Sequence, residues 1–300
     1  MKKVIFLFCI LFSQLAQAQR EVQYAQYLAN PMAINPALAG AREVFHLNAI
    51  FRRQILVGIQ SLPTSQTFAM DGRLGSNQSG NETGFIGLGL QGILDKTGLT
   101  NNTGVSGNVA YHYRLAENQM LSFGFSGGVN VLPIVDPTTS TSTSQAKGSV
   151  GFGVHLDTDM FWAGLSIPEI LKHNYGGLSA IGALQSSRPI FVQGGFKLYP
   201  TEDVSIKPSV VIAYNSGRPL GFDLNVQGKY QEKFGAALSY RQSTLLSFQK
   251  TNYFYGLITY KLIPNMEIGV SYSSKVAEAY LNDRGIYELM FTFIPNPNKQ

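Results

Sequence analysis

The sequence has almost no cysteine. Cys9 is the only one in 300 residues, and it lies in an apolar stretch at the N-terminus. This excludes a disulfide framework and any metal cluster built on cysteines. The stability of the fold therefore has to come from backbone pairing and burial, for which the chain is long enough to form one large domain.

The sequence also has little charge. Charged residues make up 14% of the chain, whereas soluble domains carry about 25%. After the first residues, no apolar run approaches the roughly 18 residues that a transmembrane helix needs. A protein with so little charge and no such helix is expected to be a transmembrane β-barrel, because a closed sheet also satisfies every backbone polar group in lipid.

The N-terminus has the pattern of a secretory signal peptide. Lys2 and Lys3 precede the apolar core VIFLFCILF, and AQA at 16–18 offers small residues at the cleavage site. The position of Cys9 inside the apolar core argues against a lipoprotein anchor. The net charge of +5 falls to +3 (5 − 2) without the two lysines, and there is no basic cluster, so nucleic acid is not an expected partner. The expected division is a signal peptide at 1–18, an N-terminal segment at 19–43, a barrel at 44–294 and a tail at 295–300.

The mature chain alternates apolar and polar residues with a strict period of two. In TGVSGNVAYHYRL (103–115) and LGFDLNVQGKY (220–230), one face is apolar and the other holds Gly, Ser, Asn and isolated charges. A soluble sandwich would load its polar face with Lys and Glu, so this face fits a crowded polar lumen better. The residues expected to form a lumen polar network are Asn108, His112, Arg114, Asp223, Asn225, Lys229, Arg241 and Glu267.

The pattern predicts an all-β antiparallel outer-membrane barrel of about 14 strands. The expected strands are 44–52, 64–74, 84–94, 103–115, 120–132, 149–157, 160–167, 190–198, 204–214, 219–230, 233–241, 252–260, 266–273 and 285–294. The connections at one end are long, especially 168–189, and those at the other end are short. In outer-membrane barrels the long loops are extracellular, so both termini are expected in the periplasm.

The stretch YLANPMAINPALAG (27–40) contains two Asn-Pro pairs among apolar residues. Proline lacks the N–H that a sheet ladder requires, so this stretch is neither a central strand nor a long helix. Its apolar residues also make a freely solvated linker unfavourable. We expect a compact plug or mouth-packing segment in which Asn30 and Asn35 cap the turns made by Pro31 and Pro36, and Gly40 provides the bend into the first strand. Its role is either purely structural or a contact with a partner protein.

Signals of an enzyme are weak. GLGLQG matches a dinucleotide fingerprint, but it lies in an alternating strand with no helix after it. The four histidines have no ligand spacing. His155 and Asp157 share a strand face, as in a membrane hydrolase, but the sequence places no nucleophile beside them. We therefore expect no enzyme activity, no catalytic residues, no cofactor and no metal.

The N-terminal QYLANPMAINPALAG, together with RRQILVGIQSLPTSQTFAMDG, AYHYRL, WAGLSIPEIL and the closing YELMFTF, resembles the PorP/SprF family of type IX secretion outer-membrane proteins. The resemblance covers nearly the whole mature chain. One departure is Ile55, where many members carry tryptophan after the Arg-Gln step.

The resemblance implies a barrel in the outer membrane that supports export or surface retention of a large adhesin with a C-terminal sorting domain. The partners it implies are type IX components of the periplasm and outer membrane, the secreted adhesin and outer-membrane lipid, with gliding motility as the process served. An outer-membrane channel or transporter for small or hydrophobic substrates is the alternative that the same barrel would support.

Overall fold

The computed structural model describes residues 26–42, 44–56, 62–74, 83–97, 100–135, 142–171, 174–175, 184–185, 188–215, 220–243, 251–274 and 283–295. The expected signal peptide, residues 19–25 and most of the expected tail lie outside them. Within these ranges, no helix has the length and apolar character required to cross a membrane.

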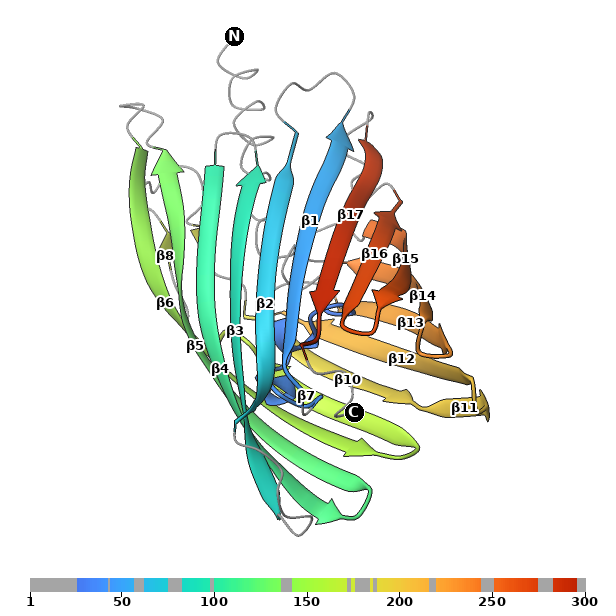
Figure 1. The fold of residues 1–300 in the computed structure, drawn as a ribbon. Helices are drawn as coiled ribbons and strands as arrows, with labels where there is room; N and C mark the ends of the chain where they lie inside the picture. Colours follow the sequence, from blue (N-terminus) through green and yellow to red (C-terminus); the bar gives the residue numbers. More distant parts are fainter. Residues whose placement is uncertain are drawn as a thin grey trace.

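The described strands form a closed antiparallel barrel of fourteen strands (Figure 1). Each of the fourteen barrel strands pairs with the next barrel strand along the chain, and β1 pairs with β17 to join the first strand to the last. The short strands β8 (Asn174–Tyr175) and β9 (Leu184–Gln185) pair with each other. The pairing of β10 with β12 completes the ring, and β11 (Leu198–Thr201) continues β10 along β12. The fourteen strands are β1 (His46–Leu56), β2 (Thr64–Leu74), β3 (Gly84–Thr97), β4 (Thr100–Ala116), β5 (Gln119–Val135), β6 (Ser142–Thr158), β7 (Phe161–Ile167), β10 (Ile190–Phe196), β12 (Val204–Tyr214), β13 (Gly221–Tyr230), β14 (Phe234–Ser243), β15 (Thr251–Ile263), β16 (Met266–Ser273) and β17 (Asp283–Phe293). This confirms the predicted fold class and strand number.

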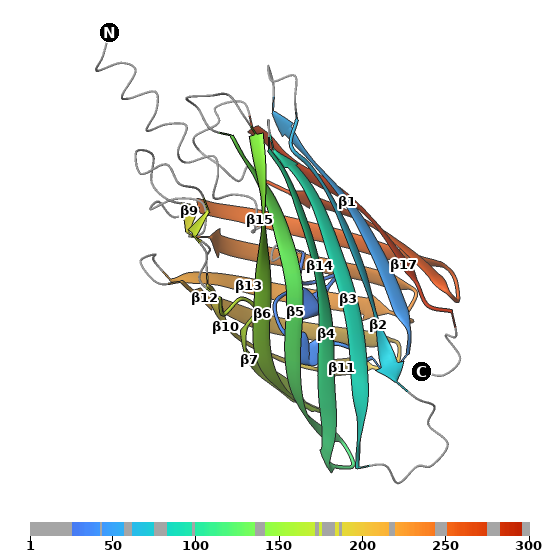
Figure 2. The same ribbon diagram turned by 90° about the vertical axis from the view of Figure 1, so that its left-hand side faces the viewer.

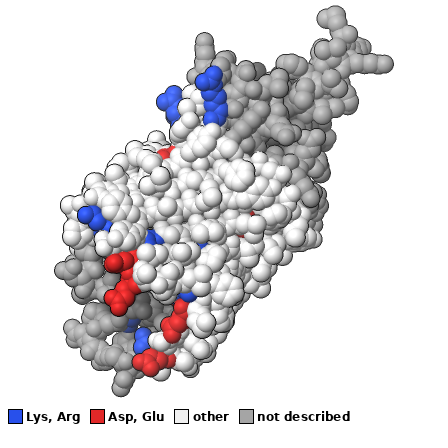
Figure 3. All heavy atoms as spheres, turned by 90° about the vertical axis from the view of Figure 1, so that its right-hand side faces the viewer, with Lys and Arg blue, Asp and Glu red and all other residues white. Residues whose placement is uncertain are grey.

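Alternation along each strand separates a lipid-facing surface from the lumen. On β4, Val105 and Val109 are 53% and 52% exposed, whereas Asn108 and Ala110 are 2% and 1% exposed. Figure 3 shows the charged side chains of one face gathered toward its two ends, with a broad and almost uncharged belt between them. An apolar belt facing outward is what a strand barrel needs in order to sit in lipid.

Several strands are longer than the sequence pattern predicts. β4, β5 and β6 have 17 residues each, which corresponds to about 56 Å along the strand, whereas a tilted membrane strand needs about 9 to 11 residues. The additional residues, such as Ser142–Gly148 of β6, are mostly small and polar. They continue the ladder with β5 at the barrel end that carries the 168–189 connection. Pairing thus extends beyond the apolar pattern because polar Ser and Thr are acceptable in strands outside lipid.

The N-terminal segment, residues 26–42, lies inside the barrel. Figures 1 and 2 both show this short blue stretch surrounded by strands. It contains two 3₁₀ turns, η2 (Pro31–Ala33) and η3 (Pro36–Leu38). Small hydrophobic clusters join the segment to the wall, one of them containing Tyr27 and Ile34 with Phe191. The lumen is therefore filled at this level by the chain's own residues.

Candidate functional site in the barrel lumen

The two Asn-Pro pairs make different turns. The Asn35 side chain accepts a hydrogen bond from the Ala37 N–H at 3.0 Å and so caps η3, as predicted. Asn30 makes no side-chain cap on η2, and its amide instead donates to the Gln91 side chain at 3.0 Å. The expectation that Asn30 caps η2 is therefore wrong, because the Asn30 amide binds a side chain of the barrel wall instead. Gly40 has a φ of +71°, a conformation that favours glycine and turns the chain toward β1.

A row of small residues in the barrel wall lies against the second half of the segment. Strand pairing brings these residues into register across β3 to β7: Gly87, Ala110, Gly124, Gly153 and Ser166. A Cβ at Gly87 would overlap the Ala39 carbonyl, and one at Gly124 would overlap the main chain of Pro36 and Ala37. The glycines and small side chains of this row allow the backbone of the segment to contact the backbone of the wall.

Hydrogen bonds between side chains and main-chain groups join the segment to this wall. The Ser166 hydroxyl donates to the Ile34 carbonyl at 2.6 Å, and the Asn35 amide donates to the Val154 carbonyl at 3.2 Å. His112 Nε2 lies 2.8 Å from the Ala39 carbonyl. Because a carbonyl only accepts, Nε2 is the donor there. Asp71 accepts from the Gly40 N–H at 2.9 Å. These contacts hold residues 32–40 against β2 to β7.

The first residues of the segment contact the opposite wall. The Tyr27 hydroxyl lies 3.0 Å from a carboxylate oxygen of Asp223 and 2.9 Å from the Asn225 side-chain oxygen. The Arg241 guanidinium lies 5.0 Å from the Tyr27 ring and 4.5 Å from the Tyr255 ring, and 3.7 Å from Asp223. A buried arginine is thus held by a carboxylate and two aromatic faces. Burial, opposed by the nearby Arg241 charge, raises the pKa of Tyr27 well above its ordinary value, so Tyr27 is a neutral hydrogen-bond donor.

Gln26 extends this contact to β17. Its amide donates to Glu288 at 3.1 Å, and Glu288 also accepts from the Ser271 hydroxyl at 2.7 Å. Arg52 of β1 lies 3.9 Å from the same carboxylate. The two carboxylates that contact the start of the segment, Asp223 and Glu288, are therefore each balanced by an arginine of the wall.

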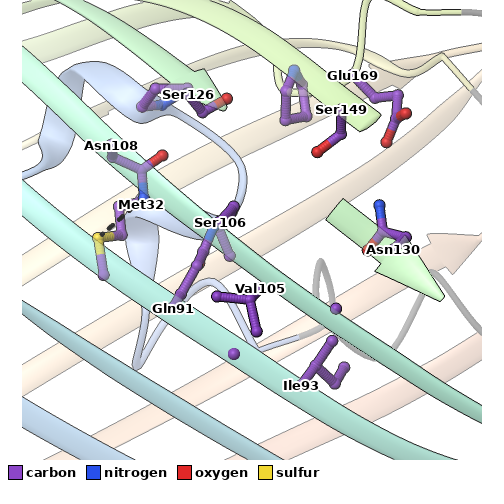
Figure 4. Close-up of a pocket in the computed structure, with 15 residues that line it drawn as sticks. Met32, Gln91, Ile93, Val105, Ser106, Asn108, Ser126, Asn130, Ser149 and Glu169 are labelled. Carbon is purple, nitrogen blue, oxygen red and sulfur yellow. Dashed lines mark hydrogen bonds between the residues drawn. The ribbon is translucent and has the colours of Figure 1, made fainter. Parts of the chain in front are cut away.

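A small polar cavity remains between the segment and β3 to β6 (Figure 4). Met32 and Asn108 line it and are joined by a weak contact of 3.6 Å from the Asn108 amide to the Met32 sulfur. Its volume of about 30 Å³ has room for about two water molecules. This cavity is too small for a substrate or a cofactor.

The structure places the eight residues of the expected lumen network in three regions. Asp223, Asn225 and Arg241 form the cluster around Tyr27. Asn108 and His112 lie on the opposite wall and contact Met32 and Ala39. The other three lie close to the turns at one end of the barrel: Arg114, Lys229 and Glu267. The N-terminal segment passes between the first two groups, so they do not meet directly.

Sequence reasoning missed several residues of this site. Glu288 was not singled out, Tyr27 was counted only among the apolar residues of the segment, and the glycines of the row were considered only as strand glycines. A usable signal existed in the sequence, because Gly87, Gly124 and Gly153 all fall on the polar face of alternating strands. Their alignment depends on strand register, which the pattern of each strand alone does not show.

The residues considered for catalysis have structural partners. Asp157 accepts from the Lys197 ammonium at 2.8 Å, and the His155 ring lies 5.7 Å from the Trp162 ring. Among the described residues there is no group of three or more His, Cys, Asp or Glu side chains placed to hold a metal ion.

Comparisons with known proteins agree with this architecture. The family model described as "Type IX secretion system membrane protein PorP/SprF" matches residues 16–293. No curated protein matches this chain.

Similar solved structures include the CymD monoaromatic hydrocarbon channel, at 11% identity and a TM-score of 0.57 over 90% of this chain and 92% of that chain. A Pseudomonas aeruginosa FadL homologue has 12% identity and a TM-score of 0.51 over 87% and 92% of the two chains. The Acinetobacter baumannii outer membrane protein Omp33 has 9% identity and a TM-score of 0.50 over 84% and 98%. At these identities the likeness shows the fold alone.

Proposed function

Because this chain belongs to the PorP/SprF family of type IX secretion system membrane proteins, we propose that it is an outer-membrane component of that system which supports export or surface retention of a large adhesin with a C-terminal sorting domain. The family match over residues 16–293 is the observation that carries the proposal. The proposed role is non-enzymatic, and it places the barrel in contact with other type IX components and with lipid.

The filled lumen supports a role in assembly or retention rather than free diffusion. Buried residues of the N-terminal segment, such as Ile34, Asn35 and Ala37 at 0% exposure, fill the lumen where a solute would have to pass. The proposed orientation has the turns beside Lys229 and Glu267 in the periplasm and the 168–189 connection outside the cell. It follows the usual loop asymmetry of outer-membrane barrels.

A channel for small or hydrophobic substrates is the second candidate. The observation in its favour is the fold shared with the CymD monoaromatic hydrocarbon channel. One fold serves many functions, so this likeness supports the channel less strongly than family membership supports secretion.

A deletion strain separates the two candidates. Its surface and culture-medium proteins are compared with those of the parent strain by mass spectrometry. The proposed role predicts that a large adhesin with a C-terminal sorting domain is lost from the surface, and that the wild-type gene restores it. Unchanged surface and medium proteins, together with slower uptake of a small hydrophobic substrate, would instead assign the channel role.

A further inference from the structure

The N-terminal segment crosses the lumen and contacts its two walls in different ways. We call residues 26–29 the latch and residues 32–40 the anchor; Asn30, whose amide donates to Gln91 of β3, lies between them. The latch lies against β13 to β17 through Gln26 and Tyr27, and the anchor lies against β2 to β7 through residues such as Asn35. Each part therefore covers a different half of the lumen.

The anchor is held by close packing on small residues of the wall and by hydrogen bonds to its main chain. It lies on the row of small residues described above, where a Cβ at Gly124 or Gly153 would overlap the segment. Wall side chains bind its carbonyls at Ile34 and Ala39. Removing the anchor would break these hydrogen bonds together and leave the row unfilled.

The latch is held by its side chains: Gln26 and Tyr27 bind charged or polar groups, while Leu28 and Ala29 pack on the apolar cluster that contains Tyr255 and Met290. Tyr27 contacts Asp223 and Asn225, and Gln26 contacts Glu288. The Gln26 side-chain oxygen is buried without a hydrogen-bond partner among the described residues. Water entering this half of the lumen would solvate Asp223 and Glu288, so release of the latch replaces its hydrogen bonds rather than leaving the carboxylates unpaired.

We propose that the segment is a two-part gate, in which the latch leaves β13 to β17 while the anchor stays on β2 to β7. Pro31 begins the turn that joins the two parts. Release of the latch opens a polar passage along the half of the lumen that holds Asp223, Arg241 and Glu288. This gate goes beyond the proposed function and does not depend on which protein the barrel helps to export.

Single cysteines report separately on the two halves. Cys9 is the only native cysteine, so an added cysteine is easily followed in the full-length protein expressed in outer membranes. Ser239 is fully buried and is paired in register with Asn225 and Tyr255 on the latch side. Ser122 is buried beside His112 on the anchor side. The two reporters are therefore Ser239→Cys and Ser122→Cys, and the protein with no added cysteine is the blank.

The experiment measures the rate of labelling by a small charged thiol reagent with and without Tyr27→Ala. Loss of the Tyr27 contacts is expected to speed labelling at position 239 about tenfold or more, and to leave the rate at position 122 within about twofold. An equal rise at both positions would mean that the segment leaves as one unit, and no rise at position 239 would mean that the latch does not move. Either result overturns the proposal.

One further measurement checks that the variants fold, and another tests the gate by ion conduction. Heat-modifiable migration on gels shows whether each variant retains the folded barrel, and Tyr27→Phe replaces Tyr27→Ala if the latter does not fold. In planar bilayers, the Tyr27 variant is expected to conduct ions more often than the wild type, and Tyr230→Phe, which alters an outward-facing tyrosine that is 48% exposed, is the matched control. Equal conductance of the Tyr27 variant and the wild type would also contradict the gate.

Discussion

Replacing Gly124 by alanine tests whether the N-terminal segment is fitted to the barrel wall. A Cβ at this position would overlap main-chain atoms of Pro36 and Ala37. These atoms cannot rotate away as a side chain would, so η3 has to shift. Overpacking of this kind costs about 1 to 3 kcal/mol, and a shift also weakens the bond from Ser166 to the Ile34 carbonyl, worth about 1 kcal/mol. We expect the segment to lose about 2 to 4 kcal/mol of docking free energy.

Gly127→Ala is the matched control, because Gly127 lies on the same strand and its added Cβ would meet nothing within 4 Å. The assay is amide hydrogen exchange of residues 26–42, followed by mass spectrometry on the protein in detergent. A loss of about 2 kcal/mol corresponds to about thirtyfold faster exchange through opening. The control should stay close to the wild type. If both variants exchange at the wild-type rate, the segment is not seated on the row and the reasoning fails.

Three further predictions concern the cluster around Arg241, the turns of the segment and the orientation of the barrel. Arg241→Met should destabilise the barrel by about 3 to 5 kcal/mol in urea titrations, because it leaves Asp223 without its cation. Adding Asp223→Asn should recover most of this loss. Equal losses in the single and double variants would contradict the pairing. Asn35→Ala removes both the cap on η3 and the bond to the Val154 carbonyl and should lower the free energy for opening the segment by about 1 to 2 kcal/mol. Asn30→Ala removes one side-chain bond, to Gln91, and no cap, so it should lower this free energy less. Hydrogen exchange measures both, and the reverse order would be inconsistent with the caps. An epitope inserted after Gly177, which lies outside the described residues, should be reached by antibody on intact cells, whereas staining only after permeabilisation would reverse the proposed orientation.

The fold class of this protein follows from its sequence alone. A lipid-facing strand has to alternate apolar and polar residues, and this requirement is met within each strand, as in Val105 to Leu115 of β4. The number of strands follows from counting such stretches. The ends of β4, β5 and β6 could not be predicted in this way, because beyond lipid the ladder no longer depends on apolar residues.

The contacts that hold the N-terminal segment depend on the assembled barrel. The turns of the segment and its need for an apolar partner follow from residues close together in sequence, as the hydrogen bond from the Ala37 N–H to the Asn35 side chain shows. The row that receives it arises only when register aligns Gly87, Gly124 and Gly153 from three strands. The partner of Tyr27, Asp223, is likewise remote in sequence. Contacts of this kind are set by strand register and barrel closure, which belong to the whole sheet and leave no periodic pattern in any single stretch.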